Sequence, residues 1–231
     1  MIVGAAIVPS PPLLDRALTG RTVVLPELRE ACAVATGRLL SVPADVVAIV
    51  GMGGATTAWD PDDRLNVAAF GPLLAGQGAG GKPGLPLALG IGAGLLDEAG
   101  YGGPRVLQSV DEAATADDCV ALGARVASLA PRVALLVVGD GSARRTPAAP
   151  GYLDERAEAF DAFAAAAIRD GDMAALASLD APLAAELMVT GRAAWQVLAG
   201  AIGLDRGAPG EILHADAPLG VSYLVAVLDV R

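Results

Sequence analysis

Short runs of branched apolar residues alternate along this chain with longer segments in which apolar residues recur every three or four positions. The short runs are typical of buried strands and lie at 2–8, 45–50, 105–110, 133–138 and 220–230. The longer segments have the spacing of amphipathic helices and lie at 26–40, at 115–130 and in several pieces across 153–203. Strands that alternate with helices in this way predict a parallel sheet with right-handed crossovers.

The expected fold is therefore a single α/β domain over residues 1–231. We expect three αβα layers around a mixed, mostly parallel central sheet, with the helical segment 153–203 packed on that sheet. A chain of 231 residues has the usual length of one domain and can bury a large core.

Three segments fit the pattern less well. Residues 66–70 predict a short strand, and a Gly-rich surface loop follows it. Gly90, Gly92 and Gly94 stand one residue short of a dinucleotide-binding fingerprint, so small residues packed on a helix are the alternative to a nucleotide site. Residues 211–219 are expected to be irregular and include His214, the only histidine.

Composition argues against two classes of partner. The formal net charge is −10, and the 16 basic residues form no basic stripe, which argues against nucleic acid. No apolar run reaches the roughly 20 residues that a membrane helix needs. Since the first residues lack a basic segment and Pro9, Pro11 and Pro12 interrupt them, we expect a cytoplasmic protein without a signal peptide.

Metal-binding side chains are few. Cys32 and Cys119 are expected to be buried thiols, because neither has a second Cys or His at metal-ligand spacing. Zinc and iron sites commonly use several imidazoles, whereas His214 stands alone. The sequence therefore predicts no metal ligands and no cofactor that this chain holds by itself.

The segment after the strand at 133–138 is the strongest candidate for a functional site. Ligands in open α/β sheets bind beyond the carboxyl ends of strands, and the loop at 139–145 is polar and Gly-rich. Asp140, Ser142 and His214 are the candidate catalytic residues, since a carboxylate, a serine and an imidazole form a hydrolytic triad. The glycines around Ser142 do not match a nucleophile elbow, so the alternative is that Asp140 and Ser142 bond their own turn.

Five other residues are candidates for ligand binding. Arg144 and Arg145 offer guanidinium groups that suit a carboxylate or a phosphate. Pairing with Asp154 or Glu155 is the alternative role for the two arginines. The remaining candidates follow the first two predicted strands and are Ser10, Gly53 and Trp59.

Short motifs along nearly the whole chain carry a family resemblance. They are Val-Pro-Ser-Pro-Pro-Leu-Leu at 8–14, Gly-Met-Gly at 51–53, Val-Val-Gly-Asp-Gly-Ser-Ala at 137–143, Phe-Asp at 160–161 and Gly-Asp-Met-Ala-Ala-Leu at 171–176. In these motifs the chain resembles class III extradiol ring-cleavage dioxygenases, specifically the catalytic β chain of protocatechuate 4,5-dioxygenase and its relatives, which include the Memo proteins. It is similar in particular to a divergent actinobacterial branch of proteins that resemble this β chain.

The resemblance implies an iron(II) site built from two histidines and a glutamate, with a further histidine as acid and base. In this chain Ser10 stands in the place of the first metal-ligand histidine, and Gly53 or a neighbour in that of the second. Ala143 stands where the acid–base histidine is expected, and Glu211 matches the glutamate by region alone. Serine, glycine and alanine do not supply the donors that hold iron(II), so we expect ring cleavage to be lost.

Two functions follow from these observations. In the first, a metal-free relative of the dioxygenase β chain holds a small molecule or a protein partner in a remnant cleft near Ser142 and His214. In the second, the protein is a working enzyme on an aromatic substrate, either metal-independent or with a metal held by other ligands. The resemblance also implies self-association or pairing with a separate small α chain.

Overall fold

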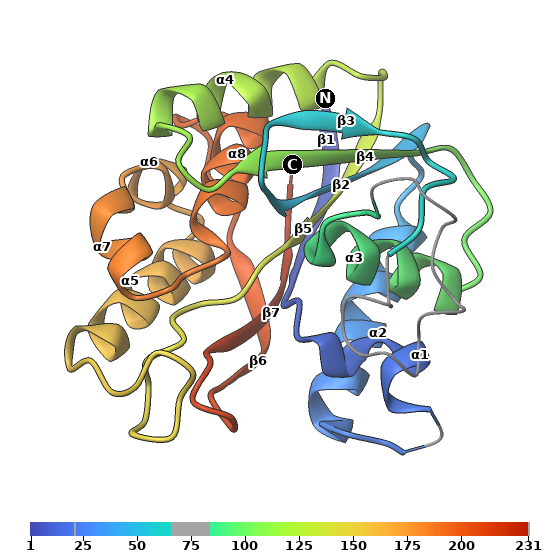
Figure 1. The fold of residues 1–231 in the computed structure, drawn as a ribbon. Helices are drawn as coiled ribbons and strands as arrows, with labels where there is room; N and C mark the ends of the chain where they lie inside the picture. The colour runs from blue at the N-terminus through green and yellow to red at the C-terminus, as the bar shows by residue number, and fades with distance from the viewer. Residues whose placement is uncertain (21, 66–83, 231) are drawn as a thin grey trace.

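A seven-stranded sheet runs through the molecule and lies between two layers of helices (Figure 1). The computed structural model describes residues 1–20, 22–65 and 84–230. The strands are β1 (Ile2–Val8), β2 (Val46–Gly53), β3 (Thr57–Trp59), β4 (Arg105–Asp111), β5 (Val133–Val138), β6 (Gly210–Asp216) and β7 (Tyr223–Leu228). The helices are η1 (Pro12–Leu14), α1 (Arg16–Thr19), α2 (Pro26–Ser41), α3 (Leu87–Glu98), α4 (Ala116–Ala127), α5 (Arg156–Asp170), α6 (Met173–Ala177), α7 (Ala181–Glu186) and α8 (Arg192–Ile202).

The strands lie in the order β3-β4-β2-β5-β1-β7-β6. Strands β4, β2, β5 and β1 run parallel to one another, whereas β3, β7 and β6 are antiparallel to their neighbours. The expected three-layer αβα fold with a mixed sheet and a parallel centre is therefore confirmed. The carboxyl ends of the four parallel strands point toward the same edge of the sheet, where this class of fold binds ligands.

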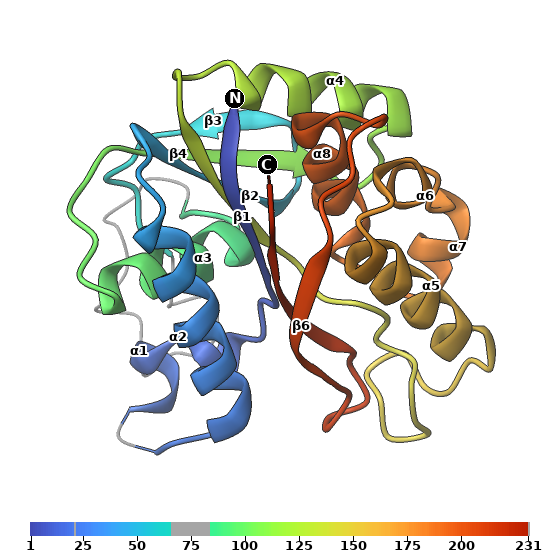
Figure 2. The same cartoon turned by 180° about the vertical axis from the view of Figure 1, so that it is seen from behind.

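The central strands are apolar on both faces because helices cover both. In β5, Val133, Leu135 and Val137 belong to the core formed with α4, α5, α6 and α8. The intervening residues Ala134 and Leu136 belong to the core formed with α2 and α3. Figure 2 shows the two groups of helices on opposite sides of the sheet. This double burial explains why the strands appear in the sequence as continuous apolar runs.

Two strands differ from the sequence-based expectation. Strand β6 occupies part of 211–219, where irregular chain was expected, and it pairs with β7 alone at the end of the sheet. An outer strand carries polar residues such as Glu211 and Asp216, so it lacks the apolar run that marks a buried strand. Strand β3 has only three residues, too few to show a pattern. The expected strand at 66–70 lies outside the described residues.

Two glycines of α3, Gly90 and Gly92, allow close packing. Gly92 lies inside this helix, where a Cβ would come within 2.7 Å of Ile49 Cγ2 and 2.9 Å of Val138 Cγ2. The missing side chain therefore lets α3 approach the sheet. All three glycines stand within a helix and not in a strand-to-helix turn. The packing alternative is confirmed at Gly90 and Gly92, whereas a Cβ on Gly94 would meet open space.

Helices α4 and α8 lie close together because small residues meet at their crossing. A Cβ on Gly123 of α4 would lie 2.2 Å from the carbonyl oxygen of Val197 and 2.5 Å from the backbone nitrogen of Ala201. Likewise, a Cβ on Gly200 of α8 would lie 2.3 Å from the carbonyl oxygen of Val120. This contact fixes α8, whose first residue, Arg192, lies beside the candidate site.

Candidate functional site

The loop after β5 is held by hydrogen bonds to two distant parts of the chain. Gly139 lies against Gly191, since a Cβ on Gly139 would come within 2.5 Å of the Gly191 Cα. The Gly191 N–H donates to the Asp140 carbonyl oxygen over 2.8 Å, and the Gly141 N–H donates to the Ser222 carbonyl oxygen over 2.8 Å. The loop at 139–145 is thereby fixed between the start of α8 and the turn before β7.

Asp140 is the polar centre of the site. Its Oδ1 accepts a hydrogen bond from the Ser10 N–H at 2.7 Å, and its Oδ2 accepts one from the Ser10 hydroxyl at 3.3 Å. The Asp140 N–H donates to Thr190 Oγ1 over 2.9 Å. The carboxylate therefore bonds the loop after β1, and not the backbone of its own turn as the alternative had it.

The charge of Asp140 is not compensated by an ion pair among the described residues. Desolvation raises the pKa of the Asp140 carboxyl to about 6, although the two hydrogen bonds from Ser10 act against this rise. Burial also raises the pKa of Cys32 and of Tyr223 to about 12, and the charge of Asp140 adds to both shifts. Asp140 can therefore exchange a proton near pH 6.

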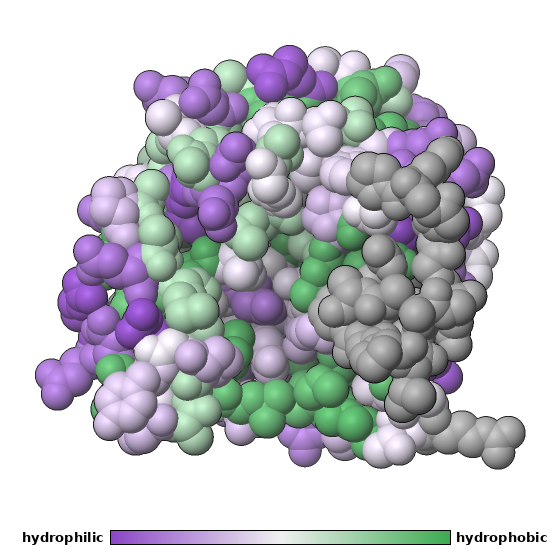
Figure 3. Space-filling view, in the orientation of Figure 1, coloured by the Kyte–Doolittle hydropathy of each residue, from purple (hydrophilic) through white to green (hydrophobic). Residues whose placement is uncertain are grey.

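Two cavities meet at Asp140. The larger, which we call the central cavity, has a volume of about 540 Å³. The smaller, which we call the side cavity, has a volume of about 310 Å³ and reaches Ser10 and Gly53. Both are lined by Met52, Glu112, Asp140 and Thr190, so they form one continuous site. In Figure 3 this face of the molecule is hollowed near its middle.

The wall of the central cavity is mostly apolar. Helix α7, the first turn of α8 and the segment between them supply most of it, through Ala181, Ala184, Ala185, Met188, Val189 and Ala193. Ala143 and Val221 complete the apolar part.

One buried cation, Arg192, also lines the central cavity and is only 4% exposed. Its Nη1 donates to the Ala114 carbonyl oxygen over 2.6 Å and to Gln196 Oε1 over 3.0 Å. Its Nη2 donates to the Glu112 carbonyl oxygen. All of these acceptors are neutral, so the hydrogen bonds position the guanidinium without compensating its charge.

Ser142 has a structural contact that the sequence did not indicate. It is fully buried, its Oγ donates to Asp161 Oδ2 over 2.6 Å, and its N–H donates to Asp161 Oδ1 over 2.8 Å. Arg145 pairs with the same carboxylate at 3.2 Å and reaches Glu158 at 3.5 Å. The Ser142 hydroxyl is thus committed to a carboxylate on α5 and not to an imidazole base.

The three candidate catalytic residues are not brought together. His214 lies on β6 opposite Val225, two strands from β1, and lines neither the central nor the side cavity. Its Nε2 is buried and has no hydrogen-bond partner among the described residues. Asp140 is at the cavities, and Ser142 is bonded to α5. This arrangement does not support the hydrolytic triad.

The candidate ligand-binding residues separate into two groups. Ser10 and Gly53 line the side cavity. Trp59 does not line it, and its Nε1–H donates to Ser109 Oγ over 2.9 Å. Neither arginine of the loop lines the two cavities: Arg145 is paired with α5, and Arg144 lies beside Gly151 with a buried Nε that has no partner among the described residues.

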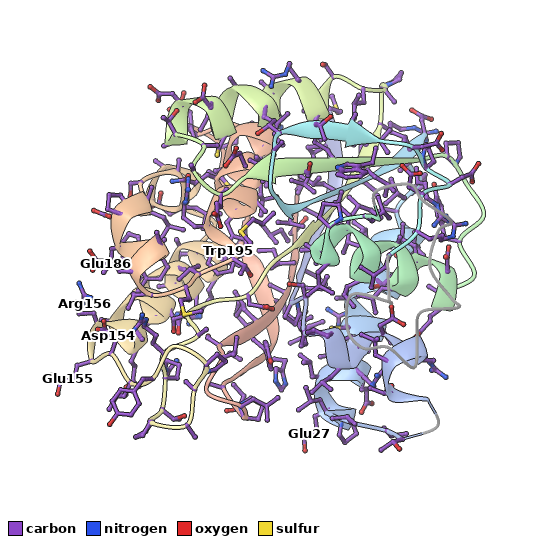
Figure 4. All side chains as sticks on the ribbon, in the orientation of Figure 1. Glu27, Asp154, Glu155, Arg156, Glu186 and Trp195 are labelled. Carbon is purple, nitrogen blue, oxygen red and sulfur yellow. The ribbon has the colours of Figure 1, made fainter. Side chains whose placement is uncertain are left out.

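Asp154, one of the two expected partners of the loop arginines, pairs instead with Arg156 at 2.7 Å. Arg156 also binds Glu186 at 2.7 Å, and Figure 4 shows these three side chains together at one side of the molecule. Figure 4 also places Trp195 on the inner part of α8, where it is 1% exposed.

The residues at the cavities do not fit the iron(II) site that the family resemblance implies. Gly53 and Ala143 bring no side-chain donor atoms, and the Ser10 hydroxyl is bonded to Asp140. Glu211 pairs with Arg38 at 2.6 Å and lines neither cavity. In residues 1–20, 22–65 and 84–230, no group of three or more His, Cys, Asp or Glu side chains is placed to hold a metal ion.

Arg192 was missed by the sequence reasoning, as were Glu112 and Thr190 at the cavities, and Asp161 was named only within the Phe-Asp motif at 160–161. Arg192 occupies the first turn of α8, where the helix dipole disfavours a cation, and that misplaced charge was the available signal. Asp161 lies on the buried side of α5 beside Phe160, so a charged residue among apolar positions was the signal there. Both are recognisable only once the helix boundaries are known.

The fold and the site together define an α/β domain with a cavity beyond the carboxyl ends of its parallel strands. No family model matches the chain, and no curated protein matches it in sequence. Among solved structures, the chain is similar to the crystal structure of uncharacterized protein JW3007 from Escherichia coli K12. The TM-score is 0.53 at 14% sequence identity, over 98% of this chain and 99% of that one. At this identity the likeness shows a shared fold.

Proposed function

We propose that the protein is a relative of the class III extradiol dioxygenase β chains that has lost the iron(II) site and binds a small organic molecule. The observation that carries the proposal is the position of Ser10, Gly53 and Ala143. The family resemblance matches Ser10, Gly53 or a neighbour, and Ala143 to the family's histidines, and these three residues line the central or the side cavity. This position supports a site that corresponds to the family's active centre and lacks its imidazoles.

The shape of the site favours a small molecule over a protein partner. A volume of about 540 Å³ is typical of ligand pockets, which are mostly apolar with a few convergent polar groups. The apolar wall from α7 and α8 and the polar junction at Asp140 follow this pattern. A protein partner would instead need a broad exposed surface.

A working enzyme is the second candidate, and Asp140 is the residue that favours it. A partly buried carboxyl with a pKa of about 6, set where two cavities meet, suits a general acid or base. According to this second candidate function, the protein is an oxygenase or another oxidoreductase that acts on an aromatic substrate. Its activity would depend on Asp140 and not on His214.

Metal analysis separates the metal-free binding protein from an iron enzyme. The purified protein is incubated with iron(II) without oxygen, desalted and assayed for bound iron, and catechol is then added in an oxygen electrode. We expect no tightly bound iron and no oxygen uptake. One retained iron per chain with catechol-dependent oxygen uptake would overturn the proposal.

Ligand-observed NMR with a set of small organic molecules, catechol included, tests the binding function. Ala185 lines the central cavity and is exposed, so Ala185→Trp is expected to fill the cavity and abolish binding. Ala33→Trp is the matched control, because Ala33 is an exposed alanine of α2 outside the two cavities. If no molecule binds, or if both variants bind as the wild type does, the proposed site is wrong.

We also propose that the protein is cytoplasmic. Cys32 and Cys119 are both buried free thiols, which suits a reducing compartment. Within the described residues, none of the helices has the length and apolar character needed to cross a membrane.

A further inference from the structure

Arg192 poses an electrostatic problem that its own contacts do not solve. It is 4% exposed, and its partners are the carbonyl oxygens of Glu112 and Ala114 and the side-chain amide of Gln196. Within the part of the chain that the structure describes, no carboxylate pairs with it. Buried charges in proteins are normally paired, since taking a lone charge out of water costs several kcal/mol or more.

The position of Arg192 suggests what compensates it. The residue lines the central cavity, and its guanidinium is bonded to Glu112, which lines the same cavity. Arg192 also opens α8, an 11-residue helix whose N-cap, Gly191, provides no side-chain cap. The free N–H groups of a first helical turn add positive potential at this point. Two independent sources of positive potential therefore lie at one wall of the cavity.

From these observations we infer that the central cavity binds a small organic acid, with its carboxylate beside Arg192 and its apolar body against α7 and α8. The inference rests on the proposed function and names the chemical class of the molecule. A guanidinium with neutral acceptors on one side keeps its charge for a further, anionic partner. The apolar part of the molecule would contact Ala184, Met188 and Ala193.

A monoanionic carboxylate suits this wall better than a phosphate. Among the described residues, the charged ones along the central cavity are one arginine, Arg192, and two carboxylic acids, Glu112 and Asp140. A dianion would be repelled by both carboxylates, whereas a single negative charge beside Arg192 meets less repulsion. Inorganic phosphate is therefore expected to compete weakly.

Matched probes test the inference without the natural ligand. Dissociation constants are measured for cyclohexanecarboxylate and for its neutral analogue cyclohexanecarboxamide, with the wild type and with Arg192→Gln and Arg192→Lys. We expect the acid to bind the wild type about tenfold more tightly than the amide, as for a hydrogen bond to a charged group. Arg192→Gln should remove this preference, and Arg192→Lys should keep part of it. Glu112→Gln, which removes a like charge, should strengthen binding of the acid.

The outcomes separate this inference from the proposed function. If the amide binds at the cavity as tightly as the acid, the carboxylate site is wrong and small-molecule binding stands. If neither probe binds, and if Ala185→Trp does not change the binding of any small molecule in the NMR set, the carboxylate inference and the proposed function are both wrong. If Arg192→Gln does not fold, the inference is tested by the ratio of the dissociation constants of the acid and the amide, measured for the wild type and for Arg192→Lys. Phosphate that displaces the acid at equal concentration would overturn the choice of a carboxylate.

Discussion

A single carboxyl group, that of Asp140, links the site to the stability of the fold. Burial raises its pKa from an ordinary value of 3.8 to about 6. Between these two values the folded protein holds a proton that the unfolded chain has lost. The stability that this group contributes is therefore complete below the ordinary pKa and is lost as the pH rises through about 6.

Asp140→Asn removes this titration while an oxygen remains to accept from Ser10. We expect the variant to be more stable than the wild type at pH 7 by roughly 1–2 kcal/mol, a value reduced for the partial exposure of the group. The difference should vanish toward pH 4. Urea unfolding from pH 4 to pH 7.5 measures it, and a difference that does not change with pH would contradict the raised pKa.

Asp45→Asn provides a control of the opposite sign. The hydrogen bond from Arg132 lowers the pKa of Asp45, so its contribution is present at neutral pH and is lost as the pH falls through its lowered value. This variant should therefore be less stable than the wild type at pH 7, with the difference shrinking in acid.

Ser142 provides a second test, because its hydroxyl donates a hydrogen bond to the buried carboxylate of Asp161. Ser142→Ala should cost about 1–3 kcal/mol, because Asp161 loses one of its donors in a buried place. Ser128→Ala is the control, because Ser128 is exposed and its hydroxyl bonds the Arg125 carbonyl oxygen of its own helix. Chemical denaturation measures both. Equal losses in the two variants would mean that the Asp161 contact has no special role.

Some contacts between single residues could be predicted from the sequence, and others could not. Ser10 and Asp140 could be placed in one site because each follows a parallel strand, and such strands end at one edge of a sheet. The contact between Ser142 and Asp161 could not, since no short-range rule relates a loop residue to a helix position 19 residues later. His214 was connected to Ser142 by chemistry alone, and in the structure the Ser142 hydroxyl donates to Asp161 instead.

Helix contacts depend on single missing side chains. At Gly123, any side chain would meet the backbone of α8, which cannot move without displacing Arg192. Gly123→Ala should therefore destabilise the protein by about 2 kcal/mol or more. Gly37→Ala is the control, since Gly37 is a helical glycine of α2 with open space around it, and it should stabilise by about 0.5–1 kcal/mol. Thermal unfolding of both variants checks the signs, and two changes of the same sign would contradict this account.

Elements buried on two sides were predictable from the sequence, and elements at the sheet ends were not. Strand β5 has six buried residues and appears as an unbroken apolar run. Strand β6 has one neighbour and a largely exposed pattern, so its residues resemble a loop. The missed strand matters for function, because it holds His214 in the sheet opposite Val225, where it lines neither the central nor the side cavity.

The whole molecule carries an excess of negative charge. With 26 acidic and 16 basic residues, the folded state is subject to self-repulsion that salt screens. Raising sodium chloride from about 10 to about 200 mM at pH 7 should raise the melting temperature by roughly 2–4 °C, equivalent to about 1 kcal/mol. Near the isoelectric point of about 4.5 the effect should disappear. A melting temperature that falls with salt at pH 7 would contradict this account.

The interior position of β1 in the sheet has a consequence for synthesis of the chain. Its two neighbours are β5, at 133–138, and β7, at 223–228, so both of its hydrogen-bonded edges are completed by residues made much later. While the ribosome is still elongating the chain, the apolar segment of β1 has already left the ribosome, and its partner strands β5 and β7 have not yet been made. Pairing of such distant segments is slow, and an exposed strand is a site for chaperones and for aggregation. The sheet therefore closes only when the last strand has emerged, and the cavity beside Asp140 forms at that late stage.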